Sequence, residues 1–144
     1  MASAAASLKG EWTYRSFVNE PKPVGGDPQA ARALIFGEGV LAITQADSGG
    51  FRAELSFGGK AVMDLAGSFR PAAQGAPAVI AARGTGRKGS GIEDFVYDYI
   101  FYPAPAWQAG IGQRQALVGT VLRAADHGNA KKGAVVSAIA VRRG

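Results

Sequence analysis

The sequence predicts an all-β protein: an eight-stranded, up-and-down antiparallel barrel with one short helical turn near residues 28–34. Apolar and polar residues alternate along eight short segments, as they do in half-buried strands. Clusters of glycine, proline and small polar residues separate these segments, and glycine alone accounts for 21 of the 144 residues. Short strands at near-regular spacing, joined mostly by hairpin-length loops, are typical of a closed antiparallel barrel.

The first predicted strand covers residues 8–19 and reads LKGEWTYRSFVN. Strict alternation places Trp12, Tyr14, Ser16 and Val18 on one of its faces. A strand with this pattern is half-buried, and we expect the face with Trp12 to point into the barrel.

A loop with prolines and paired glycines follows the first strand. Within it, Asp27 is a good helix N-cap and Pro28 suits the first helical position, so two helical turns are predicted over 28–34. The second strand is predicted over 36–45, where Gly37 and Gly39 allow a bend or a bulge.

Six further strands follow from alternation and from turn residues. Gly58 and Gly59 are predicted to form a two-residue hairpin turn between the third and fourth strands. A long loop over 103–114 carries Trp107. The six strands are predicted over 51–57, 60–70, 78–85, 94–102, 115–123 and 134–142.

The length of 144 residues predicts one domain with a real core. Residues 1–7 are small and apolar but have no basic start, so we expect a disordered tail rather than a signal peptide, followed by a single barrel domain over 8–144. No apolar run approaches the roughly 20 residues of a membrane helix, and neither a secretion signal nor lipid-facing aromatic girdles are visible. We therefore expect a cytoplasmic protein without a membrane partner.

Composition narrows the functional classes. The chain has no cysteine, which excludes disulfides and thiolate zinc sites, and its single histidine, His127, leaves no histidine cluster for a metal. We therefore predict no metal and no cofactor. The net charge is +5, but the basic residues are spread over most strands and loops, so nucleic-acid binding is not the expected function.

Two features at the ends of the domain resemble the calycin barrels, the group that includes lipocalins and avidins. Gly10 and Trp12 form a Gly-x-Trp sequence in the first strand, and the last strand ends in Arg142 and Arg143. In those families the indole plugs one end of an eight-stranded barrel and a basic residue of the last strand packs across it. The resemblance implies a structural role for Trp12 and for Arg142 or Arg143. It does not extend to biotin, because the avidin asparagine two positions after the tryptophan is Tyr14 here.

The segment from Gly84 to Gly89 matches the G-x-G-x-x-G pattern of dinucleotide sites. Such a site also needs a helix that opens at the third glycine, whereas an aromatic strand pattern follows here. We interpret the segment as a mobile turn whose Arg87 and Lys88 lie near the open end of the barrel. His127, within a Gly/Asn/Lys loop, is interpreted as a solvated loop histidine.

Aromatic and hydroxyl side chains suggest a pocket inside the barrel. An interior lined by Tyr14, Ser16, Tyr97 and Tyr99 would combine apolar walls with a few hydroxyls, as small-molecule sites do. Pure packing of a filled core is the alternative. The candidate ligand-binding residues are Tyr14, Ser16, Tyr97, Tyr99, Phe101, Arg87 and Lys88.

The leading functional interpretation is a barrel that binds a modest, partly apolar ligand, with no catalytic residue assigned. The loops at the open end hold more cations than carboxylates, which favours an anionic ligand. A barrel enzyme of cyclase or isomerase type is an alternative, with Tyr14, Tyr97, Tyr99 and Asp98 as acid–base groups. Alternation places Asp98 opposite Tyr97 and Tyr99, which favours binding. A structural module with a filled barrel is the third interpretation.

The last three strands are apolar on both faces. Strand 115–123 has Leu117 and Val121 on one face and Val118 and Leu122 on the other. Because a barrel buries only one face of each strand, the other face needs a partner. The sequence therefore predicts a homodimer or a dimer of dimers through the sixth to eighth strands, with small residues such as Ala138 at the contact.

Overall fold

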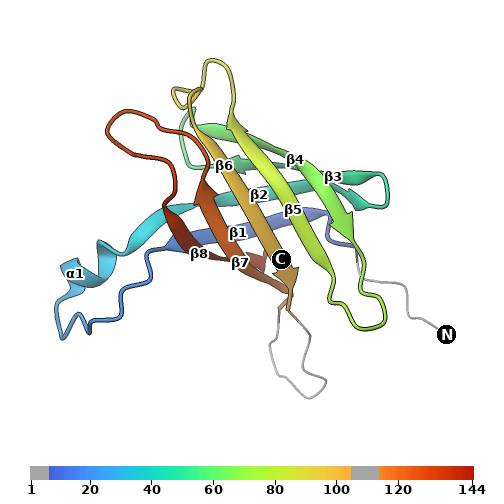
Figure 1. Cartoon of the computed structure of the whole chain (residues 1–144), viewed down its shortest axis with the longest axis horizontal. Helices are drawn as coiled ribbons and strands as arrows, with labels where there is room; N and C mark the ends of the chain where they lie inside the picture. Colours follow the sequence, from blue (N-terminus) through green and yellow to red (C-terminus); the bar gives the residue numbers. More distant parts are fainter. Residues whose placement is uncertain (1–6, 105–113) are drawn as a thin grey trace.

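The computed structural model describes residues 7–104 and 114–144, and it confirms the all-β barrel. Eight antiparallel strands follow one another in chain order, and β8 pairs with β1 to close the barrel (Figure 1). No strand end differs from its predicted position by more than two residues. The strands are β1 (Gly10–Phe17), β2 (Ile35–Asp47), β3 (Gly50–Ser56), β4 (Val62–Arg70), β5 (Val79–Gly86), β6 (Val96–Pro103), β7 (Ala116–Arg123) and β8 (Val135–Arg142).

The loops gather at the two ends of the barrel as an up-and-down order requires. The connections after β1, β3, β5 and β7 lie at one end, along the left and upper left of Figure 1, and this end is called the mouth below. The connections after β2 and β4 lie at the opposite end. The predicted loop over 103–114, with Trp107, falls mostly outside the described residues, as do residues 1–6 of the predicted tail. No helix in the described part of the chain is long and apolar enough to cross a membrane.

One short helix, α1 (Pro28–Arg32), lies in the connection between β1 and β2. Its N-cap is Asp27, whose Oδ1 accepts a hydrogen bond from the backbone N–H of Gln29 at 3.0 Å. The helix ends two residues before the predicted end at residue 34. The carbonyl of Leu34 instead accepts the backbone N–H of Val18 at 2.7 Å, which extends the contact between β1 and β2.

The turn between β3 and β4 is longer than predicted. The backbone N–H of Phe57 donates to the carbonyl of Ala61 at 2.9 Å, so three residues rather than two form the turn. Gly58 and Gly59 both have positive φ, at 100° and 56°, as a glycine pair in a tight turn allows. The longer turn lets Phe57 and Ala61 both face the interior at the mouth.

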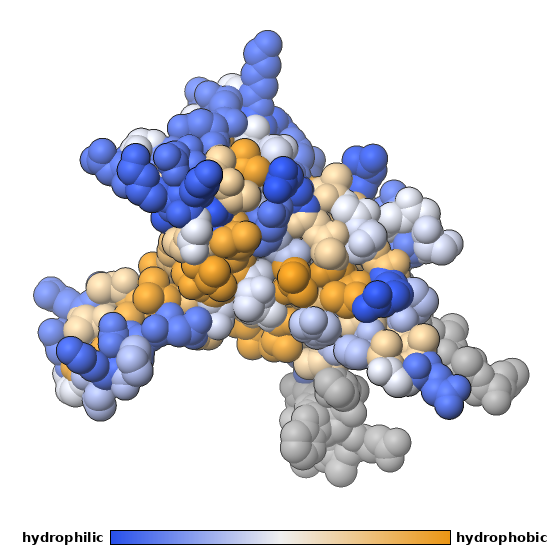
Figure 2. All heavy atoms as spheres, viewed as in Figure 1, coloured by the Kyte–Doolittle hydropathy of each residue, from blue (hydrophilic) through white to orange (hydrophobic). Residues whose placement is uncertain are grey.

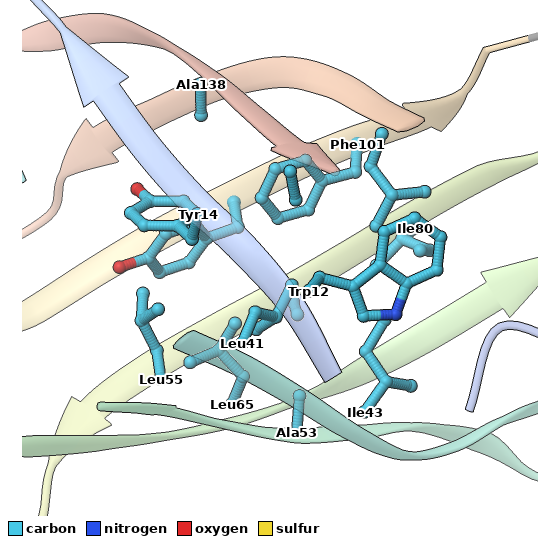
Figure 3. Close-up of a cluster of buried hydrophobic side chains, with 14 of the residues drawn as sticks. Trp12, Tyr14, Leu41, Ile43, Ala53, Leu55, Leu65, Ile80, Phe101 and Ala138 are labelled. Atoms are coloured by element: carbon cyan, nitrogen blue, oxygen red, sulfur yellow. The ribbon is translucent and has the colours of Figure 1, made fainter. Parts of the chain in front are cut away.

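The half of the barrel away from the mouth is filled by Trp12 and its neighbours. Trp12 is fully buried, and Figure 3 shows its indole in a cluster with Ile43, Ile80 and Phe101. Its Nε1 donates a hydrogen bond to the carbonyl of Leu8 at 3.0 Å, so the buried indole N–H is satisfied. This cluster closes one end of the barrel.

The last strand covers the indole with a cation, as expected from the sequence. The guanidinium carbon of Arg142 lies 5.3 Å from the centroid of the Trp12 ring, within the range of a cation–π contact. Arg142 Nη1 also donates to the carbonyl of Ser7 at 2.7 Å. Arg143 has a different position, with its Nη1 3.9 Å from a carboxylate oxygen of Glu11 on the surface. Arg142 is therefore the residue of the pair that packs on the indole.

The outer surface of the barrel differs from one side to the other. On β3, β4 and β5 the outward residues include ion-paired side chains such as Glu54, Asp64 and Arg83. Around β6, β7, β8 and the mouth-side ends of β1 and β2, the outward residues include many large apolar side chains, and Figure 2 shows this apolar surface across the front of the barrel. We call this surface the apolar wall. Its exposed members are Phe17, Val18, Ile35, Ile100, Tyr102, Val118, Leu122, Val135 and Ile139.

The structure shows which residues of β7 and β8 point outward. Leu117 and Val121 are buried inside the barrel, whereas Val118 and Leu122 are about two-fifths exposed. Ala138 is 3% exposed and lies in the interior (Figure 3), so the expectation that it belongs to an outer contact surface was wrong. The reason is the register with β1, because Ala138 pairs with inward-facing Ser16.

Candidate functional site: a pocket at the mouth of the barrel

The mouth half of the barrel is hollow. A cavity of about 180 Å³ lies between residues of β1, β2, β4, β6 and β7 and the mouth loops. Four of the predicted ligand-binding residues line it, namely Tyr14, Ser16, Tyr97 and Tyr99. Phe101, a fifth, is fully buried below them and packs edge-on against Tyr14 with ring centroids 6.4 Å apart. The structure therefore brings these five residues together.

Hydroxyl groups line the inner end of the pocket. Tyr14 and Tyr99 meet at 6.3 Å between ring centroids, and the Tyr99 hydroxyl donates to Met63 Sδ at 3.2 Å. Burial raises the pKa of Tyr14 to about 12, although hydrogen bonds with Ser16 and Tyr99 act in the opposite direction. Burial also raises the pKa of Tyr99 well above its ordinary value. Both phenols therefore stay neutral near pH 7 and offer hydrogen bonds rather than charge.

A cluster of side chains surrounds the Tyr97 hydroxyl at the mouth. Tyr97 and Phe95 line the cavity, whereas Arg123 and His127 contact these lining residues from outside it. His127 Nε2 lies 2.8 Å from the Tyr97 hydroxyl oxygen, and Arg123 Nε donates to it at 3.1 Å. The His127 ring stacks on Phe95 with centroids 3.7 Å apart. His127 is therefore part of the mouth and not a solvated loop residue as predicted. The loop after β7 folds back, with backbone hydrogen bonds between His127 and Ala130, and so brings the imidazole over the barrel.

Arg123, which the sequence did not single out, contacts residues that line the cavity. Alternation along β7 puts it on the same face as Leu117 and Val121, which are both buried inside the barrel. Its guanidinium lies 5.3 Å from the centroid of the Phe36 ring and 5.8 Å from that of Tyr97. Residue 123 lies two positions after inward-facing Val121, so alternation in the sequence already indicated that the Arg123 side chain points inward.

The two predicted cations of the mouth loop lie elsewhere. Arg87 binds the outer wall, where its Nη2 is 2.5 Å from carboxylate oxygens of both Asp64 and Glu54. This contact holds the pKa of Asp64 below its usual value and raises that of Arg87. Lys88 is exposed. Neither side chain lines the cavity, so the structure does not bring Arg87 and Lys88 together with the tyrosines.

Asp98, a candidate of the enzyme interpretation, is also on the outer wall. Its carboxylate forms a bidentate ion pair with Arg83, with hydrogen bonds of 2.8 and 3.0 Å. This ion pair holds the pKa of Asp98 below its usual value. Within residues 7–104 and 114–144, no carboxylate lines the pocket and no group of His, Asp and Glu side chains could hold a metal ion.

Close packing accounts for the glycines at positions 84 and 86, so no bound nucleotide is needed to explain them. A Cβ on Gly84 would lie 2.6 Å from Met63 Sδ, and one on Gly86 would lie 1.5 Å from the carbonyl oxygen of Ile92. Bends and turns lead from Gly86 into β6, with no helix after Gly89. The prediction that this segment is a connection between strands is confirmed.

Comparisons with protein-family models, with curated proteins and with solved structures found no match for this chain.

Proposed function

We propose that this protein is a calycin-like binding barrel that holds a modest, partly apolar small molecule in its mouth-side pocket. The observation that carries the proposal is the contrast between the two halves of the interior. One half is filled around Trp12, whereas the other keeps a cavity of about 180 Å³. Well-packed interiors leave few voids larger than a water molecule, so a cavity of this size needs an explanation.

The walls of the pocket suit such a ligand. Phe36, Phe57, Phe95 and Val121 provide apolar surface, while the tyrosines and Ser16 provide a few hydrogen-bonding groups. Small-molecule sites combine these two kinds of surface, the first for affinity and the second for orientation. An engineered cavity of about 150 Å³ accommodates benzene, so this pocket fits a single ring or a short chain.

A barrel enzyme of cyclase or isomerase type is a second candidate function. The observation that favours it is the 2.8 Å contact between the Tyr97 hydroxyl and His127 Nε2, which is within the distance for proton transfer. The described part of the pocket offers this pair no carboxylate, since Asp98 faces outward. Chemical change of a bound ligand that is lost in His127→Ala would favour this candidate.

We also propose that a second copy of the chain covers the apolar wall. This surface continues from β6 through β8 to β1, with Val118 beside Ile139 and Phe17 beside Ile35 across neighbouring strands. A contiguous apolar surface of this kind is rare on a monomer. A two-fold dimer supplies every copy with the same complementary surface, so no other protein is required.

Native mass spectrometry of protein purified from its own host tests the binding function. We expect the wild type to retain a small molecule. Ala61→Phe should lose it, because Ala61 lines the pocket at the mouth and a phenyl ring there occupies the space. Ala66→Phe makes the same change on an exposed residue of β4 and should keep the molecule. Equal retention in Ala61→Phe and wild type would overturn the proposed site.

A further inference from the structure

We infer that the cluster formed by Arg123, Tyr97 and His127 binds the carboxylate of a small carboxylic acid whose single ring or short chain fills the pocket. This inference rests on the proposed function, because it assigns the chemical class of the ligand for the same pocket. It gives a role to Arg123 and His127, neither of which the sequence pattern marked as functional.

Arg123 lies across the mouth. It comes from β7, and Phe36, on whose ring its guanidinium packs at 5.3 Å, belongs to β2, which is three strands further around the barrel. Aromatic faces hold an arginine fork in a fixed plane, which prepares it for a flat anion. Its Nε donates to Tyr97 and its Nη1 to the carbonyl of Lys131, whereas Nη2 has no hydrogen-bond partner among the described residues.

Among the described residues, the charge of Arg123 also lacks an ion-pair partner. Arg15, Arg83 and Arg87 each have a carboxylate oxygen within 3.5 Å. Within the described chain, no carboxylate lies within ion-pair distance of Arg123, although this side chain is partly buried. A partly buried guanidinium whose Nη2 has no hydrogen-bond partner among the described residues is suited to a charge-assisted hydrogen bond with a carboxylate.

Tyr97 and His127 complete the binding group. The Tyr97 oxygen lies between Arg123 Nε and His127 Nε2. With the imidazole proton on Nε2, both nitrogens donate to this oxygen, and the hydroxyl proton of Tyr97 remains for an acceptor on the ligand. Stacking on Phe95 fixes the imidazole plane in this position.

Because the described interior of the pocket is uncharged, we expect the carboxylate of the ligand to lie at the mouth. Tyr14 and Tyr99 are uncharged, and no cation lines the described part of the cavity. A carboxylate buried there would lose its hydration without gaining an opposite charge. The acid therefore binds with its apolar part inward and its carboxylate against Arg123.

Isothermal titration with matched acids and amides tests this inference at pH 7. The probes are benzoic acid with benzamide, and hexanoic acid with hexanamide, so that each pair keeps its shape and differs in charge. We expect at least one acid to bind about tenfold more tightly than its own amide, as a charged hydrogen bond contributes. Arg123→Gln should abolish this preference and leave the affinity for the amide within about twofold, which shows that the pocket is still folded.

Two controls separate the possible failures. Arg83→Gln removes a guanidinium from the outer wall and should leave both affinities unchanged. Equal binding of acids and amides, or a preference that survives Arg123→Gln, would overturn the carboxylate site and leave the binding function standing. Absence of binding by all four probes would also overturn it, and the ligand retained in native mass spectrometry would then decide the binding function separately.

Discussion

The packing of the closed half of the barrel depends on Trp12. Replacing it by alanine removes a fully buried indole, its hydrogen bond to Leu8 and its contact with Arg142. We expect Trp12→Ala to lower the free energy of unfolding by about 3–5 kcal/mol, as for other large aromatic deletions. Urea denaturation checks this, with Thr13→Ala on the exposed side of the same strand as control. A midpoint for Trp12→Ala equal to that of the control would contradict the assigned role.

Tyr14 should lower the free energy of unfolding at alkaline pH. Its pKa is about 12 in the folded chain and 10.0 in a free tyrosine, so the unfolded chain releases the proton first as the pH rises. Stability is therefore unaffected by this group below about pH 10 and falls between about pH 10 and 12. By pH 11 the loss from Tyr14 alone is about 1 kcal/mol.

Tyr14→Phe removes this proton and should weaken the fall in stability. The measurement is urea denaturation of the wild type and of the variant at pH 8.5 and pH 11. The difference between the two pH values should be smaller in the variant. Equal differences would show that the pKa of Tyr14 is not raised by folding.

At the scale of the strands, a set of glycines lets the barrel close. Gly39, Gly67 and Gly119 lie within strands where a Cβ would come within 1.7 to 2.1 Å of a carbonyl oxygen on the adjacent strand. Strands can approach this closely only where the side chain is absent, and sharp bends of this kind close small barrels. The glycine content of the sequence is thus a requirement of the curvature as well as of the turns.

Gly119→Ala tests this account of the curvature. Its Cβ would lie 1.7 Å from the carbonyl oxygen of Ile100, so β6 and β7 must shift apart. We expect a loss of about 1–3 kcal/mol in the free energy of unfolding. Gly26→Ala is the control, because a Cβ there meets no atom within 4 Å, and it should change stability by less than about 0.5 kcal/mol. A Gly119→Ala protein as stable as the control would refute the close approach.

Alternation made the strands and the inner face of the pocket predictable. It placed Tyr14, Tyr97 and Tyr99 inside and Asp98 outside, because the side chains of a strand alternate strictly. His127 could not be predicted in this way, since its position depends on how a loop folds back over the mouth.

Arg87 shows a related limit of sequence reasoning. It follows the last residue of β5, and its backbone N–H donates to the carbonyl of Val62 at 2.9 Å, so the pairing with β4 continues past the strand end. Its side chain therefore lies beside outward-facing Asp64 and Glu54 and not over the mouth. The charge balance of the loops alone does not show which cations are already paired.

At the scale of the whole molecule, the apolar wall predicts the assembly. Light scattering at micromolar concentration should give twice the monomer mass of 14.8 kDa or a multiple of it. Val118→Arg places a charge on the wall and should yield monomers, whereas Ala66→Arg, on an exposed residue of β4, should not. A monomer mass for the wild type would end the proposal of a second copy.

The hollow half of the barrel contains a natural reporter of its occupancy. Met63 lines the pocket, and Met1 is the only other methionine of the chain. Carbon-13 labelling of the methionine methyl groups therefore gives an NMR spectrum in which the Met63 signal can be assigned by Met63→Leu.

The most direct test of the binding function is a titration of the labelled protein with small-molecule extract from its host. We predict that the Met63 signal shifts and that Ala61→Phe abolishes the shift. A compound that binds the protein tightly and leaves the Met63 signal unmoved would contradict a ligand site inside the barrel.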